Sequence, residues 1–473
     1  MSLHVFVGPT LPREEVLALA PGAVVHPPVA HGDLTVLHTG PGDTVVIIDG
    51  YYHQRGAVRH KELLGRLAAG VRVVGCSSMG ALRAAELHPY GMVGHGTVFR
   101  MYCDGVVEAD DEVAVAHGPA PDYDSLSTPL VTVRHAVDAA RRADLLTAQE
   151  AADVVARARS IPYQQRSWRA IGHRPPSAVP DLPDALKRLA AFLERHPEHR
   201  DIKAADARDT LRELARGGLL CAPPGAWATT TDWRSRAHHD WDAEFTGASV
   251  DGTPVGNAAV LRHRQVYDTG FPALWRRFAL TGLADESGPA DESGPAHESG
   301  LAHEAGTAPA PDGVESRALA WAAHRGLTPA ELAPHQKDEW LTAGEATELT
   351  PREMLLHVLV RSYRPPLGAA AVIAALPGLV DDARTRRAVA ECHAVNDEVA
   401  RWRPGQSIAQ LTGSVLVDHL KQTWGLPGAT DRELTAAARD RGLASLGTAV
   451  AAVRPFFLHR RLGAQEQKAG TPC

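Results

Sequence analysis

One short stretch constrains the fold of this chain more than any other. Residues 71–75 form an apolar run typical of a buried strand, and a helical pattern begins directly after Ser77 and Ser78. Because no room is left for a loop, the strand must turn sharply into the helix. Such a turn between small residues resembles a nucleophile elbow, in which a serine hydroxyl stands beside helix N–H groups. The alternative is a serine that caps the helix, which is the more common outcome for this stretch taken alone.

The first hundred residues alternate strand-like and helix-like segments. Strands are expected at 4–8, 44–49 and 71–75, with a weaker one at 23–26, and helices at 10–20, capped by Thr10, and at 56–69. This alternation predicts an α/β fold with an open, parallel, Rossmann-like sheet. Residues 97–118 suggest a β-hairpin excursion around Asp104 and Gly105. The rest of the chain is predicted to be mostly α-helical.

Length and composition limit the possible functions. A chain of 473 residues suggests two or three domains, and a net charge of −7 argues against a general nucleic-acid binder. No apolar stretch reaches the roughly 20 residues that span a membrane. The N-terminus runs straight into a strand instead of a signal peptide, and the five cysteines form no C-x-x-C pair. A cytoplasmic protein with reduced thiols, without contact to a membrane, is therefore expected.

A six-residue acidic unit, Ala-Asp-Glu-Ser-Gly-Pro, repeats from residue 284 and decays by residue 303. It offers almost nothing to bury, which predicts a disordered linker that separates two bodies. The predicted divisions are an α/β core with a helical extension (1–217), a Trp-containing helical segment (218–283), the linker (284–313) and a helical C-terminal domain (314–473).

Several chemically capable residues follow strand ends, which meet at one edge of a parallel sheet. Thr10 follows the first strand, Asp49 ends the strand at 44–49, and the serines follow the strand at 71–75. Asp49 alone could bind a metal or a ribose. The chain, however, has no G-x-G-x-x-G after the first strand and no G-x-x-x-x-G-K-[ST], which disfavours dinucleotide and P-loop functions.

A lysine is the expected partner of the serine. Projection of residues 56–69 as a helix places His60 and Lys61 on the apolar side with Leu64. A desolvated lysine can accept the proton of a serine hydroxyl, although snorkelling to water is the simpler interpretation of Lys61. His60 is the alternative base.

The helix that follows the serines supplies the other expected site groups. The N–H groups of Met79 and Gly80 are expected to hold an oxyanion. Further along this helix, the spacing of Arg83 and Glu86 predicts an internal ion pair.

Two other polar clusters have ordinary explanations. Asp110, Asp111 and Glu112 could form a cation site, but a solvated edge or a partner-binding surface is the commoner role of such a run. His238 and His239 lack a third ligand at helical spacing, which favours an exposed polar cluster over a metal site.

Taken together, six segments resemble the core of TfuA-like proteins. They are residues 7–11, 48–52, 57–63, 75–87, 91–94 and 111–114, in that order, and the resemblance covers roughly residues 1–215. The resemblance implies a hydrolase with a Ser-Lys pair, in which the lysine matches Lys61 and the serine is Ser78 or Ser77. Elbow spacing favours Ser78. Cys76 stands where alanine is expected, and a buried small cysteine explains it better than a sulfur-carrying thiol.

The resemblance also implies partners. TfuA-like proteins act with a YcaO enzyme, which would bind ATP and Mg²⁺ itself, in thioamide formation on ribosomally made peptides. The expected substrate is a ThiS-like thiocarboxylated sulfur carrier whose hydrolysis releases sulfide, with no cofactor in this chain. The alternative is a non-catalytic scaffold that binds the YcaO enzyme and the precursor peptide and raises their affinity.

Overall fold

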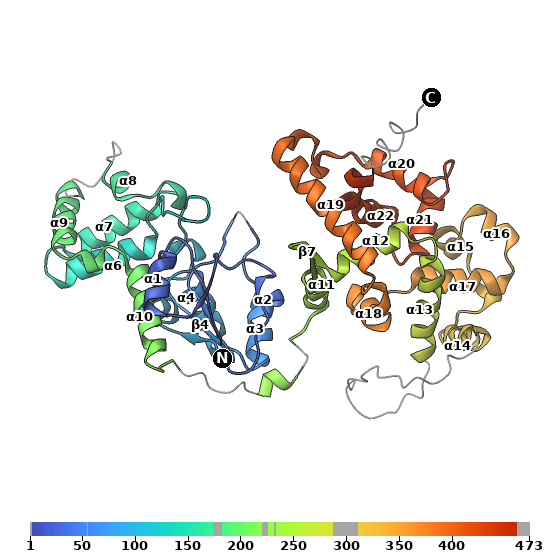
Figure 1. Cartoon of the computed structure of the whole chain (residues 1–473), viewed down its shortest axis with the longest axis horizontal. Coiled ribbons are helices and arrows are strands. Elements are labelled where there is room, and N and C mark those ends of the chain that lie inside the picture. Colours follow the sequence, from blue (N-terminus) through green and yellow to red (C-terminus); the bar gives the residue numbers. More distant parts are fainter. Residues whose placement is uncertain are drawn as a thin grey trace. The chain divides into compact units, whose positions relative to one another are not determined.

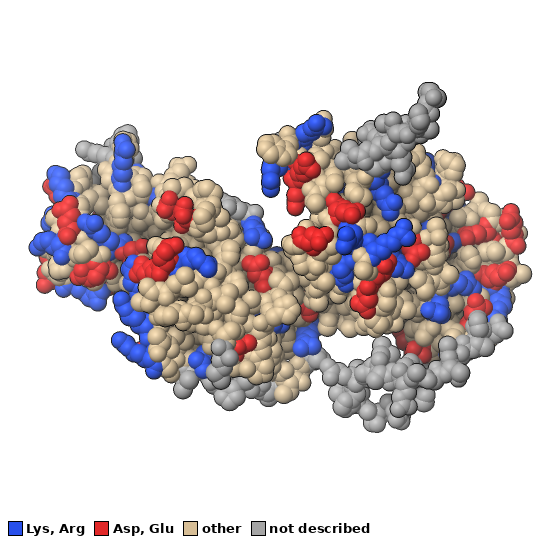
Figure 2. Space-filling view, in the orientation of Figure 1, with Lys and Arg blue, Asp and Glu red and all other residues tan. Residues whose placement is uncertain are grey.

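The chain forms two compact units, residues 1–234 and 235–473 (Figure 1). The computed structural model describes residues 2–53, 55–173, 182–219, 226–230, 233–286 and 311–460. Acidic and basic side chains are interspersed over the visible face of both units (Figure 2). Within the described ranges, no helix is both long and apolar enough to cross a membrane.

The first unit is built on a five-stranded parallel sheet in the order β2-β1-β3-β4-β5. The strands are β1 (Leu3–Phe6), β2 (Val24–His26), β3 (Thr44–Ile47), β4 (Arg72–Gly75) and β5 (Val93–Gly94), and the helices that cover the sheet are α1 (Arg13–Leu19), α2 (Asp33–Val36), α3 (His60–Ala68), α4 (Met79–Leu87) and α10 (Ile202–Ala215). The predicted parallel α/β sheet is confirmed, and β5 is an additional strand.

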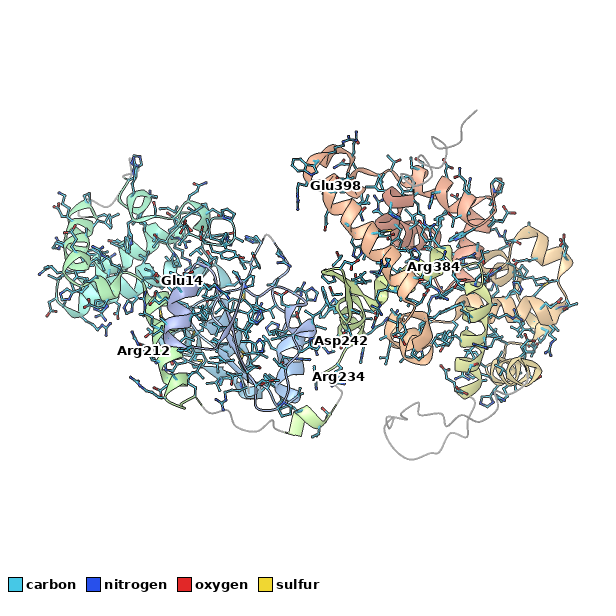
Figure 3. The ribbon with its side chains drawn as sticks, in the orientation of Figure 1. Glu14, Arg212, Arg234, Asp242, Arg384 and Glu398 are labelled. Atoms are coloured by element: carbon cyan, nitrogen blue, oxygen red, sulfur yellow. The ribbon has the colours of Figure 1, made fainter. Side chains whose placement is uncertain are left out.

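Both faces of the sheet are buried, which explains why its strands are apolar throughout. Val45 and Ile47 of β3 face α3 and α4, whereas Val46 and Ile48 face α1 and α10. Helices α1 and α10 are amphipathic: Glu14 and Arg212 (labelled in Figure 3) are exposed, whereas Val16 and Leu211 are buried.

The predicted β-hairpin over 97–118 is wrong. Residues Thr97–Cys103 form helix α5, and Asp110–Glu112 form a short 3₁₀ turn. The carboxylate of Asp206 in α10 accepts the N–H groups of Thr97 and Val98, at 2.8 and 2.7 Å. A residue more than a hundred positions away therefore caps this helix and outweighs the local β-propensity of its sequence.

A second helical layer completes the first unit. It consists of α6 (Leu130–Arg142), α7 (Ala148–Arg159), α8 (Trp168–Gly172) and α9 (Leu182–Arg195). These helices share one apolar cluster of their own, in which Val133, Val154 and Leu189 are buried. The predicted helical extension of the core is thus present.

The second unit is mostly helical, as predicted. Its elements are α11 (Arg236–Phe245), β6 (Gly247–Val250), β7 (Thr253–Gly256), α12 (Asn257–Tyr267), α13 (Phe271–Asp285), α14 (Pro311–His324), α15 (Pro334–Trp340), α16 (Ala343–Glu348), α17 (Pro351–Ser362), α18 (Gly368–Ala375), α19 (Ala383–Trp402), α20 (Gly413–Thr423), α21 (Asp431–Arg439) and α22 (Leu446–Val453). The hairpin β6–β7 interrupts the segment that was predicted to be helical.

The helices on the two sides of the acidic repeat belong to one unit. Leu283 of α13 and Ala318 of α14 lie in the same apolar cluster, so the expectation that the repeat separates two bodies is wrong. The predicted linker itself lies largely outside the described residues. The predicted domain boundaries remain predictions.

Candidate functional site

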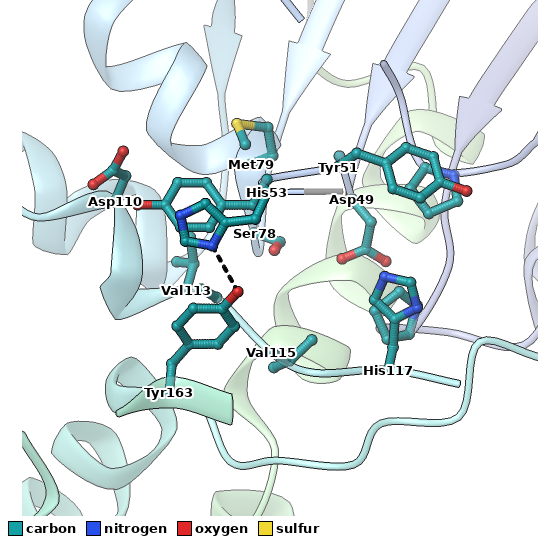
Figure 4. A pocket seen from close by; sticks show the side chains of 15 residues that line it. Asp49, Tyr51, His53, Ser78, Met79, Asp110, Val113, Val115, His117 and Tyr163 are labelled. Atoms are coloured by element: carbon teal, nitrogen blue, oxygen red, sulfur yellow. Dashed lines mark hydrogen bonds between the residues drawn. The ribbon is translucent and has the colours of Figure 1, made fainter. Parts of the chain in front are cut away.

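The strand order places a crevice at one edge of the sheet. The chain leaves β1 toward β2 on one side, whereas it leaves β3 toward β4 on the other, so the order reverses between β1 and β3. In open parallel sheets ligands bind beyond the strand ends at such a point. Here a pocket of about 60 Å³ is lined by Asp49, Ser78, Met79, His53 and Tyr163, among others (Figure 4).

Asp49 organises the loop after β1. The buried carboxylate accepts the N–H groups of Gly8 (2.9 Å) and Thr10 (3.0 Å) and the Thr10 hydroxyl (2.6 Å). Thr10 therefore does not cap α1, whose N-cap residue is Pro12. With its oxygens occupied in this way, Asp49 acts as a structural anchor at the pocket, and no group of three metal-ligating side chains occurs among the described residues.

The two serines have different surroundings. Ser77 has a left-handed backbone (φ 65°), is fully buried, and donates its hydroxyl to the Cys76 sulfur at 3.4 Å. Ser78 is the N-cap residue of α4, yet its side chain makes no capping hydrogen bond. Its hydroxyl instead lies in the pocket with Asp49 (Figure 4). The alternative, in which the serine side chain caps the helix, is therefore wrong for Ser78. The buried Ser77 does not line the pocket.

The helix start beside Ser78 offers one amide to a ligand. The Gly80 N–H donates to the Ile48 carbonyl at 3.3 Å and is already used. The Met79 N–H makes no hydrogen bond within the described part of the chain, and Met79 lines the pocket. Of the two amides predicted to hold an oxyanion, Met79 is therefore the available one.

Two glycines allow the turn between β4 and α4. A Cβ atom on Gly80 would overlap the Ile47 carbonyl oxygen, and one on Gly75 would overlap the Gly80 carbonyl oxygen. Only a residue without a side chain lets the helix approach the strands this closely. The turn that presents Ser78 therefore depends on these positions.

We expect Gly80→Ala to destabilise the first unit by about 3 kcal/mol, because the backbone has to move to relieve the overlap. Hydrogen exchange of the β3 and β4 amides measures this locally. Gly40→Ala is the matched control, since an added Cβ there meets no atom within 4 Å. Equal protection in the two variants would contradict the packing argument.

The predicted bases lie away from the pocket. Helix α3 begins at His60, a turn later than predicted, so Lys61 is its second residue. The Lys61 ammonium donates to the Trp233 carbonyl. His60 contacts Glu86 at 2.8 Å. Neither side chain lines the pocket that holds Ser78.

The predicted ion pair between Arg83 and Glu86 is confirmed, with 2.6 Å between the guanidinium nitrogen and the carboxylate oxygen. Its carboxylate is the same one that His60 contacts. His60 is therefore part of a cluster on the outside of α3 and α4.

A lysine that the sequence analysis missed lies beside the pocket. Lys203, in the first turn of α10, is 3% exposed. Its Nζ atom lies 3.8 Å from Asp49 Oδ1 and donates to the Val113 carbonyl at 3.1 Å, and both residues line the Ser78 pocket. Burial lowers the pKa of Lys203, while the nearby Asp49 carboxylate opposes this effect. Projection of 202–215 as a helix would have placed Lys203 on the buried side with Ala207 and Thr210.

The acidic run near the pocket is divided among separate partners. Glu112 pairs with Arg134 at 2.7 Å, and Asp111 lies 3.7 Å from Arg166. Only Asp110 lines the pocket. The three carboxylates thus do not converge on one point, and the predicted solvated edge is wrong for Glu112, which is buried in its ion pair.

The remaining candidates are explained by burial and pairing. His238 in the second unit is buried and lies 3.4 Å from Asp242, so the predicted exposed cluster is wrong for this residue. Burial raises the pKa of Cys76 to about 12, which leaves it a thiol at neutral pH. The interpretation of Cys76 as a buried small residue is in keeping with this.

Comparison with models of known protein families identifies part of the first unit. Residues 49–167 match the profile of the family described as TfuA-like protein. The matched range contains Asp49, Lys61 and both serines, and it ends before Lys203. No curated protein matches the chain. The predicted resemblance and its position in the N-terminal unit are therefore confirmed: the first unit carries a TfuA-like domain.

Proposed function

We propose that this chain, whose first unit carries a TfuA-like domain, hydrolyses the thiocarboxylate of a ThiS-like sulfur carrier. The sulfide released would serve a YcaO enzyme that forms a thioamide in a ribosomally made precursor peptide. In this proposal the chain itself uses no cofactor, and ATP and Mg²⁺ belong to the YcaO partner. The observation that carries the proposal is that the Ser78 side chain lies in the pocket at the sheet edge and makes no capping hydrogen bond.

The proposed reaction has two steps. The Ser78 oxygen attacks the carbonyl carbon of the thiocarboxylate, the C–S bond breaks, and the hydroxyl proton passes through a neutral base to the departing sulfur, giving HS⁻. Water then cleaves the resulting ester and restores the serine, and the carrier leaves as a carboxylate. The Met79 N–H is suited to hold the oxyanion that forms in each step.

Lys203 is the base that we propose: it lines the neighbouring cavity, and the residues that it contacts line the Ser78 pocket. It is buried, its pKa is lowered, and it contacts Asp49 and Val113 of the pocket. Lys61, the residue that the family resemblance implies, donates instead to the Trp233 carbonyl. We therefore propose a Ser78–Lys203 pair and keep Lys61 as the competing assignment.

The test is sulfide release from purified thiocarboxylated carrier by the full chain, without YcaO enzyme and without ATP. We expect release far above the uncatalysed rate, together with conversion of the carrier to its carboxylate form, followed by mass spectrometry. A carrier that already ends in a carboxylate is the control. Release at the uncatalysed rate, combined with tighter binding of precursor peptide to the YcaO enzyme, would instead favour the scaffold role.

A further inference from the structure

A second cavity lies next to the Ser78 pocket. Its volume is about 300 Å³, and Pro9 and Val115 line both spaces. Hydroxyl and cationic side chains dominate its lining: Thr10, Ser125, Ser127, Thr128, Thr132, Ser167, Arg200 and Lys203. The lining is therefore largely polar.

One hydroxyl in this cavity has no partner. Thr132 is 3% exposed, and its Oγ1 atom makes no hydrogen bond in the described part of the chain. A buried polar group without a partner destabilises the fold. Since Thr132 lines the cavity, a ligand there would satisfy this hydroxyl.

The same residue belongs to an uncapped helix start. Helix α6 has 13 residues, its N-cap residue Pro129 supplies no side-chain hydrogen bond, and its first turn contains no acidic residue. The N–H groups of Thr132 and Val133 donate to the Pro129 carbonyl, whereas those of Leu130 and Val131 make no hydrogen bond among the described residues. Free N–H groups and the helix dipole together favour an anion.

Cationic side chains complete the lining. The Lys203 ammonium has three donors, and the Val113 carbonyl and the Asp49 carboxylate occupy two directions. Arg200 donates through Nε to the Leu193 carbonyl, which leaves its two terminal nitrogens for a ligand. One carboxylate, Asp201, also lines the cavity, and it caps α10 through the Ala204 N–H. The carboxylates of Asp49, beside Lys203, and of Asp201 balance the two cations, so the Thr132 hydroxyl and the start of α6, and not net charge, carry the argument for an anion.

We infer that this cavity binds an anion of the carboxylate class, held by the Thr132 hydroxyl and the first turn of α6, with Arg200 in the lining. The inference goes beyond the proposed hydrolysis, because binding needs no reaction at Ser78. The carboxylate could come from a free small acid or from the C-terminus of a peptide, and both sources offer the same two oxygens to these donors.

Saturation-transfer NMR with acetate and the full-length protein tests the site without any carrier. We expect saturable binding by the wild type and about fivefold weaker binding by Thr132→Val, which loses one hydrogen-bond donor. The variant is expected to fold, because it replaces an unpartnered hydroxyl with a methyl group of similar size. Thr39→Val is the matched control, since Thr39 also carries a buried hydroxyl without a partner and does not line the cavity. Its affinity should equal that of the wild type.

Acetylglycine and acetylglycinamide distinguish the sources. Tighter binding of acetylglycine than of acetate supports a peptide C-terminus, and equal binding supports a free small acid. Binding of acetylglycinamide as tight as that of acetylglycine would overturn the inference, as would absence of acetate binding or equal affinity in Thr132→Val. Because carrier hydrolysis is measured separately, failure of this site leaves the Ser78 proposal standing.

Discussion

Replacement of Ser78 by alanine is expected to lower sulfide release from the thiocarboxylated carrier by about a thousandfold or more. The serine hydroxyl would form the bond to carbon in the first step, and loss of a nucleophile of this kind typically removes most of the rate enhancement. The substitution removes one oxygen from a side chain that makes no capping hydrogen bond, so the fold should be retained. Initial rates of sulfide release at saturating carrier measure the effect.

Ser77→Ala is the matched control for Ser78→Ala. It removes the neighbouring hydroxyl, which is buried and contacts only the Cys76 sulfur among the hydrogen bonds of its side chain. We expect less than a tenfold change in rate. The reverse result, with Ser77→Ala inactive and Ser78→Ala active, would transfer the nucleophile to Ser77. Full activity in both variants would exclude a serine mechanism.

The site residues that come directly after strand ends could be predicted from the sequence. Strand ends in a parallel sheet share one edge whatever the details of packing, which is why Thr10, Asp49 and Ser78 do meet there. The role of Thr10 was nevertheless missed. A threonine before a helical pattern is an ordinary cap, and only the position of Asp49 shows that its hydroxyl bonds across to another strand end.

The parts that depend on packing between distant segments could not be predicted in the same way. Helix α5 carries a β-like sequence and is capped by Asp206 from α10, which no local pattern indicates. Helix α10 also brings in Lys203, about 150 residues after Asp49 in the sequence. For Lys61 the error was one of helix length: the later start of α3 puts this lysine in the first turn, near Trp233.

Lys203→Met is expected to lower sulfide release at neutral pH by a hundredfold or more, whereas Lys61→Met should change it less than about threefold. General-base catalysis contributes a factor of this size. The two variants remove the same ammonium group from two lysines of the first unit, so each serves as the control for the other. The inverse pattern would restore Lys61 as the base and reject the Ser78–Lys203 pair.

A third variant separates proton transfer from charge compensation. Lys203 lies beside the Asp49 carboxylate, so its removal also leaves that carboxylate without a nearby cation, and circular dichroism has to show that Lys203→Met is folded. Lys203→Arg keeps the positive charge but cannot lose a proton near neutral pH. If the lysine acts as a base, the arginine variant stays inactive; recovery of activity would mean that charge alone is required.

The pH dependence of the wild type provides an independent test of the same role. A base must be neutral to accept the serine proton, so the rate should rise with pH until the pKa of the lysine is passed. Because burial lowers the pKa of Lys203, this rise should level off below the pH at which an ordinary lysine titrates. Lys61→Met should keep the same profile, and Lys203→Met should lose the rise. A wild-type rate that falls over this range would contradict a lysine base.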